Sequence, residues 1–175
     1  SLRSSVAHRL SLADAPGADR HAEGLVQVMQ DALVNHSAAL DVDRLCRWQS
    51  ALFPGGTSGL QRIAVGRLRD HLDAMQIVSG ALGREVVHYE APPSVRVPAE
   101  MGHFLAWFES TRPDGAAAEK KPINGIARAA LVHLWFESIR PFEDGNGRLG
   151  RALADMALAQ DMHAHDAQAS PALVR

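Results

Sequence analysis

Residues 140–151 read Arg-Pro-Phe-Glu-Asp-Gly-Asn-Gly-Arg-Leu-Gly-Arg, and this stretch is the most informative part of the chain. The acidic residue Asp144 precedes a Gly-Asn-Gly turn, after which we expect a helix that carries two arginines. At a helix N-terminus, the free backbone N–H groups and the positive end of the helix dipole both attract phosphate. This order of residues therefore predicts a magnesium-phosphate site in a loop between two helices.

The glycines and arginines of this stretch suit a phosphate site. Gly145 and Gly147 permit backbone conformations and close approaches that a Cβ would block, so free amides there can form a nest for an anion. Arg148 and Arg151 lie three residues apart at the helix start, and each guanidinium can bind phosphate oxygens through two hydrogen bonds. Either feature alone is more often an ordinary turn or a solvated helix face, and their combination is what makes the prediction specific.

The acidic and aromatic residues of the loop extend the prediction. Asp144 offers a hard oxygen ligand beside the nest, and magnesium is normally held by one or two carboxylates together with substrate phosphates. Phe142 is apolar within a polar loop, so we expect it to insert into the core and anchor the loop.

Composition limits the class of protein. The chain has 175 residues, of which 46% are hydrophobic, and this length suits one domain with its own core. The net charge of −2 gives no general attraction to nucleic acid or to an acidic membrane. No apolar run approaches the roughly 20 residues that cross a bilayer, and no signal peptide is visible. Because the single cysteine, Cys46, has no partner for an internal disulfide, we expect a reducing, cytoplasmic location.

Apolar spacing along the chain predicts a mostly helical domain. The expected helices cover residues 19–35, 41–53, 98–110, 122–139 and 146–160, and residues 4–12 have the pattern of the end of another helix. Residues 85–89 are rich in β-branched and aromatic side chains and follow a turn at 79–83, which predicts a β-hairpin. The helix over 122–139 is apolar almost all round, so we expect it to be central. We read residues 1–175 as a single domain taken from a longer protein.

Residues 140–151 resemble the signature of the Fic (Fido) family, His-x-Phe-x-(Asp/Glu)-Gly-Asn-(Gly/Lys)-Arg-x-x-Arg, at every defining position except the first, where this chain has Arg140. Residues 130–139 are similar to the helix before that signature, and residues 78–93 are similar to the hairpin called the flap. Residues 48–66 resemble a bacterial branch of the family. The resemblance implies an all-α, mostly helical Fic/Fido fold, in which a central helix bundle carries a β-hairpin flap over the active-site loop.

The resemblance also implies a reaction. Fic enzymes mostly transfer AMP from ATP to a hydroxyl of a protein Ser, Thr or Tyr, and a minority move other phosphate-containing groups. The expected ligands are therefore ATP as substrate and Mg²⁺ as cofactor, with a target protein as partner and no nucleic acid or membrane. A homodimer is compatible with the sequence.

The residue roles follow from the matching signature positions. Asp144 is expected to hold magnesium, while Arg148 and Arg151 are expected to bind the outer phosphates. The anion hole around the α- and β-phosphates is expected to comprise Gly145, Asn146 and Gly147. The flap is expected to dock the target segment as an added strand. Its docking residues are Glu85, Val86, Val87, His88 and Tyr89. The positions that the resemblance marks as catalytic are Arg140, Asp144 and Asn146.

The absence of the signature histidine affects the expected rate of AMP transfer. In the family this histidine takes the proton from the attacking hydroxyl, and imidazole suits the task because its pKa lies near neutrality. Arg140 cannot do so, because a guanidinium stays protonated in proteins. We therefore expect the chain to bind ATP-magnesium but to transfer AMP slowly or not at all. His133 is expected to be a core residue, and His88 to face solvent or pack on the hairpin rather than replace the base.

Several alternatives stay open at this point. Arg140 is explained by a naturally degenerate site, by an engineered inactive variant, or by a chemistry that needs no base. The function is accordingly either that of an impaired AMP transferase or that of a non-catalytic nucleotide-binding or protein-docking module. A DNA-binding role is weakly supported, because Arg62, Arg67 and Arg69 near the flap are too few for a basic footprint.

Regulation in the family often depends on an inhibitory helix with the pattern (Ser/Thr)-x-x-x-Glu-(Gly/Asn), whose glutamate pairs with the second signature arginine. No such pattern occurs in these residues. We expect this helix in a preceding N-terminal part, and we expect Arg151 to be free of a carboxylate partner here.

Overall fold

The computed structural model describes residues 18–81, 84–116 and 123–169. The helix end expected at residues 4–12 lies outside these residues. The described α-helices are α2 (Ala18–Val34), α3 (Val42–Leu52), α4 (Val97–Ser110), α5 (Gly125–Ile139) and α6 (Asn146–Ala169), and a short 3₁₀ helix covers Ser94–Arg96. The strands form two antiparallel pairs, β1 (Thr57–Ser58) with β2 (Gln61–Arg62) and β3 (Gln76–Ser79) with β4 (Val86–Glu90). The expectation of a mostly helical domain with a β-hairpin is confirmed.

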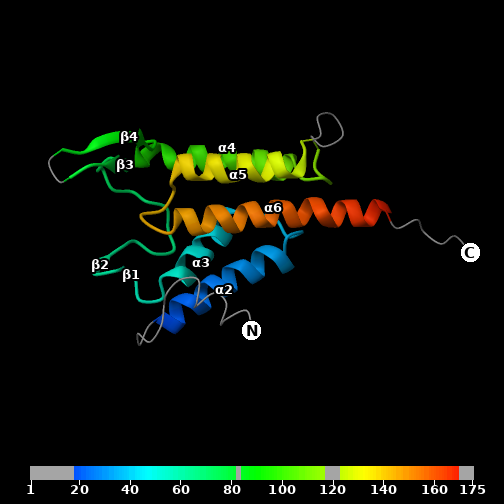
Figure 1. The fold of residues 1–175 in the computed structure, drawn as a ribbon, viewed down its shortest axis with the longest axis horizontal. Helices are drawn as coiled ribbons and strands as arrows, with labels where there is room; N and C mark the ends of the chain where they lie inside the picture. Colours follow the sequence, from blue (N-terminus) through cyan, green and yellow to red (C-terminus); the bar gives the residue numbers. More distant parts are fainter. Residues whose placement is uncertain (1–17, 82–83, 117–122, 170–175) are drawn as a thin grey trace, which may run out of the picture.

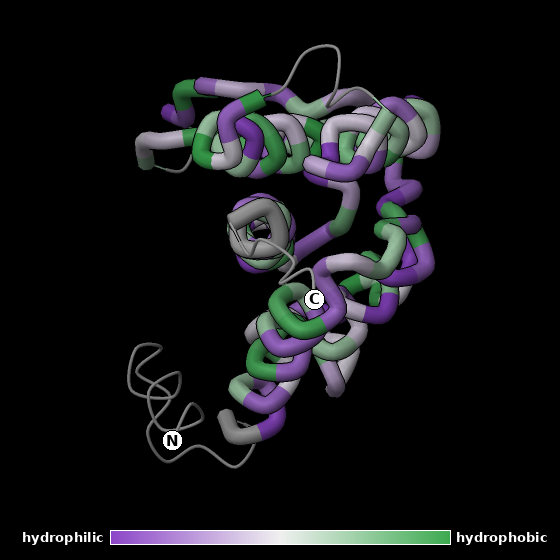
Figure 2. The backbone as a smooth tube through the Cα atoms, turned by 90° about the vertical axis from the view of Figure 1, so that its right-hand side faces the viewer, coloured by the Kyte–Doolittle hydropathy of each residue, from purple (hydrophilic) through white to green (hydrophobic). Residues whose placement is uncertain are grey.

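The helices are arranged around α6. Helices α4 and α5 lie side by side in one layer, α2 and α3 form another, and α6 runs between the two layers (Figures 1 and 2). The core extends across all three levels, because side chains of α3, α4, α5 and α6 belong to one buried cluster. Within the described residues, no helix combines the length and hydrophobicity needed to cross a membrane.

The expectation that the helix over 122–139 is central was wrong. The side chains of Ile126, Leu131 and Leu134 on α5 are 75%, 45% and 66% exposed, whereas Leu149 and Met156 on α6 are fully buried. Apolar residues all round a helix indicate burial only where other elements cover every face. Helix α6 is covered on both sides, while the outer face of α5 has no neighbour among the described residues.

The helix boundaries agree with the expected ones at some ends and differ at others. Helix α5 begins at Gly125 rather than at residue 122, because the side chain of Asn124 accepts hydrogen bonds from the amides of Ile126 and Ala127 and so caps the helix. Helix α6 continues to Ala169, well beyond the expected end at residue 160. The expected cap of α3 is confirmed, since Asp41 Oδ1 accepts a hydrogen bond from the amide of Arg44 at 2.6 Å.

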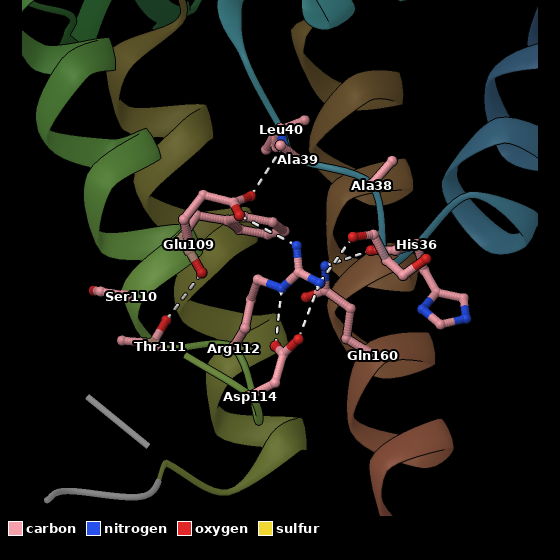
Figure 3. Close-up of polar contacts among 12 residues, drawn as sticks. His36, Ala38, Ala39, Leu40, Glu109, Ser110, Thr111, Arg112, Asp114 and Gln160 are labelled. Atoms are coloured by element: carbon pink, nitrogen blue, oxygen red, sulfur yellow. Dashed lines mark hydrogen bonds and ion pairs between the residues drawn. The ribbon is translucent and has the colours of Figure 1, made fainter. Parts of the chain in front are cut away.

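The end of the bundle farthest from residues 140–145 is held by polar contacts (Figure 3). Arg112 pairs with Glu109 at 3.2 Å and donates a hydrogen bond to the carbonyl oxygen of Ser37 at 2.9 Å. Gln160 on α6 donates to the carbonyl oxygen of His36 at 2.7 Å. These contacts tie the loop between α2 and α3 to the end of α4 and to α6, so the two outer layers are fixed relative to the central helix.

Close packing of α2 on α3 generates a prediction about stability. A Cβ added to Gly24 would lie 1.7 Å from the carbonyl oxygen of Ala51, whereas a Cβ added to Gly102 on α4 would meet nothing within 4 Å. We expect Gly24→Ala to destabilise the fold by about 1–3 kcal/mol or more, because α2 must move away from α3. Gly102→Ala is the matched control and should stabilise α4 by up to about 1 kcal/mol.

Urea unfolding followed by circular dichroism measures both free energies of unfolding. Equal stability of the Gly24→Ala variant and the unsubstituted chain would contradict the close contact between these helices.

Candidate functional site

The loop between α5 and α6 is closed by one side chain. Asn146 accepts a hydrogen bond from the amide of Phe142 at 3.0 Å and donates one to the carbonyl oxygen of the same residue at 2.8 Å. Asn146 is 2% exposed and Phe142 is fully buried, as expected for the anchor of the loop. The side chain of Asn146 therefore shapes the loop, and its backbone amide is the group that remains available to a ligand.

The start of α6 has the features of an anion nest. Gly145 has a φ of +90°, and a Cβ at this position would lie 2.9 Å from the Phe53 ring, so glycine is required there. The carbonyl oxygen of Gly145 accepts hydrogen bonds from the amides of Arg148 and Leu149 at 3.1 and 3.0 Å. Among the described residues, the amides of Asn146 and Gly147 have no hydrogen-bond partner. Two free N–H groups at the positive end of the α6 dipole are suited to bind phosphate.

The first signature arginine is fixed in place before any ligand binds. The guanidinium of Arg148 lies over the ring of Phe53, with 4.6 Å between Cζ and the ring centroid. The pKa of Arg148 is lowered mainly by burial; the charge of Asp144 raises it, and the charge of Arg151 lowers it further. A stacked guanidinium loses little conformational freedom when it binds an anion, which favours a preorganised phosphate ligand.

The second signature arginine, Arg151, is exposed. In the part of the chain that the structure describes, no Asp or Glu forms an ion pair with it. Arg151 and Glu137 both lie against Gly147, since a Cβ there would be 3.6 Å from Arg151 Nη1 and 3.4 Å from Glu137 Oε1. Arg151 and Glu137 thus both border the nest at Gly147.

Arg140 ends α5 and turns the chain into the loop. Its φ of 47° is left-handed, and it is the one non-glycine residue with positive φ among the described residues. Its amide donates to the carbonyl oxygen of Phe136 at 3.0 Å, and its Nη1 lies 3.6 Å from Glu137 Oε2. The side chain is thus engaged by the last turn of α5, and as a permanent cation it offers no proton acceptor.

A segment that we call the strap (residues 57–69) supports the loop from outside. Arg69 is 2% exposed, and its Nε donates to the carbonyl oxygen of Arg140 at 2.7 Å. Its amide donates to the carbonyl oxygen of Pro141 at 2.9 Å. The amide of Ala64 donates to Glu143 Oε2 at 2.9 Å. These contacts fix the end of α5 and the loop, and a buried cation there is stabilised by the carbonyl groups of the helix C-terminus.

Sequence reasoning missed the strap. In the sequence, Arg69 stands out only as one of a few arginines near the flap, and nothing marks Ser58, whose hydroxyl donates to Asp144 Oδ2. The available signal was the pair of hairpin glycines, Gly56 and Gly59, whose φ values of 67° and 57° permit the tight turns of β1 and β2. Nothing in the sequence alone indicates which loop this hairpin contacts.

The flap β3–β4 lies on the other side of the loop from β1–β2 (Figure 1). Every residue of both strands is exposed, and the register shifts between Ile77 and Val78, where β4 carries one extra residue, His88. The hydroxyl of Tyr89 donates to the carbonyl oxygen of Ser138 at 2.7 Å and so attaches the flap to the end of α5. The outer edges of this two-stranded sheet have no strand partner in the described chain.

The two histidines considered as replacement bases are both engaged elsewhere. His88 Nε2 lies 2.6 Å from the hydroxyl of Ser79 on the neighbouring strand. His133 is half-buried between α5 and α6, where a Cβ on Gly150 would lie 3.2 Å from its ring. His88 thus packs on the hairpin, as expected, whereas His133 is half-buried and is not part of the buried core.

Comparison with known proteins shows which family this chain resembles. The model of the Fic/DOC family matches residues 39–158. A probable protein adenylyltransferase of Aquifex aeolicus is 30% identical over 73 residues, which are 42% of this chain and 20% of that protein. The uridine 5'-monophosphate transferase of Xanthomonas campestris is 28% identical over 121 residues, which are 69% of this chain and 21% of that protein.

Solved structures agree with the family match. A Fic domain containing signaling protein from Bacteroides thetaiotaomicron has a TM-score of 0.62 and 21% identity, over 90% of this chain and 56% of that one. A Fic family protein from Desulfovibrio desulfuricans has a TM-score of 0.59 and 23% identity, over 91% of this chain and 44% of that one. The chain thus spans about a fifth of the curated relatives and about half of these solved chains. It belongs to the Fic/DOC family and has the Fic fold.

Proposed function

We propose that this chain is a Fic-type nucleotidyltransferase domain that binds Mg-ATP and transfers AMP to a protein hydroxyl, with turnover impaired by Arg140. The observation that carries the proposal is the pair of unpartnered amides at Asn146 and Gly147. They lie beside Arg148, which is held over Phe53 but forms no ion pair with a described acidic residue. A site that presents this much unpaired positive potential favours a polyphosphate ligand.

The residues present fit a magnesium ion that is shared with a nucleotide. Asp144 offers one carboxylate beside the nest, and no group of three or more His, Cys, Asp or Glu in the described residues could hold a metal alone. Magnesium typically takes one or two carboxylates and completes its coordination with substrate phosphates and water. When bound, it would neutralise charge that develops on the phosphates during transfer.

The chain's own residues would do the remaining work. The free amides at the start of α6 hold the inner phosphates, and Arg148 and Arg151 hold the outer ones. The exposed edges of the flap can receive an extended target segment as an added strand, which brings its hydroxyl toward the loop. Phosphoryl-type transfer depends mainly on such positioning and electrostatic stabilisation, so much of the machinery is present.

Arg140 limits the final step. A general base typically contributes about 10²- to 10⁴-fold to the rate, and a guanidinium cannot supply one. The ion pair with Glu137 also keeps the side chain of Arg140 on the last turn of α5. This pairing favours the alternative function, a nucleotide-binding or protein-docking module without turnover.

The transferred group follows from the nucleotide that binds. One relative is named as an adenylyltransferase and another as a uridine 5'-monophosphate transferase. We propose AMP transfer, and calorimetric titration with ATP and with UTP in the presence of Mg²⁺ tests that choice. Tighter binding of UTP than of ATP would contradict it.

Restoring the base tests the catalytic half of the proposal. Histidine is among the residues that tolerate a left-handed backbone, so Arg140→His should fold like the unsubstituted chain. We expect it to raise the rate of AMP transfer from labelled ATP, to itself or to an added protein, by about 10²- to 10⁴-fold.

Arg140→Ala is the matched control, because it removes the ion pair with Glu137 without adding a base. It should show no comparable gain. Equal rates for the Arg140→His and Arg140→Ala variants would show that the missing base does not limit turnover.

Substituting an arginine that is expected to bind phosphate tests the proposal that the chain binds Mg-ATP. We expect Arg148→Ala to weaken binding of Mg-ATP by about 10-fold or more, because a hydrogen bond to a charged group is typically worth about 1.5–3 kcal/mol. Arg67→Ala is the control, since Arg67 is an exposed arginine that pairs with Asp70. Isothermal titration calorimetry measures both affinities, and an unchanged affinity for Arg148→Ala would refute the assignment.

A further inference from the structure

The carboxylate of Asp144 has a partner outside the signature. The hydroxyl of Ser58, at the end of β1, donates a hydrogen bond to Asp144 Oδ2. Both residues are half-buried, and they are far apart in the sequence. The contact therefore depends on how the β1–β2 hairpin is folded against the loop.

Both oxygens of Asp144 are held by this arrangement. Oδ2 accepts from Ser58, and Oδ1 accepts from the amide of Gly145 at 2.5 Å. A carboxylate that is held at both oxygens has a fixed plane. Each oxygen has two acceptor positions, so the hydrogen bonds leave room for a metal ion.

The hairpin that carries Ser58 is itself fixed at both ends. The amide of Gly56 donates to the carbonyl oxygen of Phe53 at 2.9 Å, and the amide of Ile63 donates to the carbonyl oxygen of Gly56 at 3.1 Å. The Phe53 ring also contacts the nest, where it lies against Gly145 and under the Arg148 guanidinium, so the hairpin and the nest share one support. Within the hairpin, Ser58 pairs with its strand partner on β2, which fixes the direction of its side chain.

We propose that Ser58 is a positioning residue that orients Asp144 for magnesium. This inference rests on the proposed function, because it assumes that Asp144 is the metal ligand. Magnesium requires nearly ideal octahedral geometry, so a ligand that is already oriented binds it better than one that must be ordered first. Outer-shell partners of metal ligands typically change metal affinity by about 10- to 100-fold when they are removed.

The test measures how much magnesium improves nucleotide binding. The affinity for a fluorescent N-methylanthraniloyl ATP is measured in EDTA and again in saturating Mg²⁺, and the ratio of the two affinities is the gain from the metal. We expect Ser58→Ala to lower this gain by about 10-fold while the affinity in EDTA is unchanged. Ser58→Thr keeps the hydroxyl and should restore most of the gain.

Thr57→Val removes a neighbouring hydroxyl and is the matched control, which should leave the gain unchanged. Asp144→Ala calibrates the measurement, because it should abolish the gain. In the Asp144→Ala background, adding Ser58→Ala should not change the nucleotide affinity in Mg²⁺ any further, since Ser58 acts through Asp144.

The outcomes separate this inference from the proposed function. If Asp144→Ala abolishes the gain and Ser58→Ala leaves it unchanged or increases it, only the role of Ser58 is refuted. If the unsubstituted chain binds no nucleotide, or gains nothing from Mg²⁺, the proposed function fails and the role of Ser58 fails with it.

Discussion

The paired hydrogen bonds between Asn146 and the backbone of Phe142 are the constraint on which the site depends. They close the turn between α5 and α6 at a buried position, where an unpaired amide would be costly. With the turn closed, the amides of Asn146 and Gly147 have no partner among the loop's own carbonyl groups. The nest is therefore a consequence of how the loop is folded, and it exists before any ligand arrives.

The strap holds the loop between α5 and α6 rigidly. Arg69 holds the end of α5, Ala64 holds Glu143, and Ser58 holds Asp144. Each contact joins residues that are far apart in the sequence. A catalytic or binding loop that is fixed from several directions keeps its ligands in place, which is what preorganisation requires.

The signature, the helical class and the flap could be predicted from sequence because they depend on local patterns. The buried anchor Phe142 and the cap at Asp41 are of this kind. The central position of α6 could not be predicted, because apolar residues on α5 do not reveal which face lacks a neighbour. The roles of Ser58 and Arg69 were missed for a related reason, since both act through contacts that only the folded chain creates.

In this account, the chain binds Mg-ATP, but Arg140 impairs the transfer of AMP. Phosphorus NMR of Mg-ATP with the unsubstituted chain tests both statements most directly. We predict that the three phosphate resonances shift or broaden on binding while pyrophosphate accumulates slowly or not at all. An unchanged ATP spectrum, or rapid release of pyrophosphate, would contradict the account.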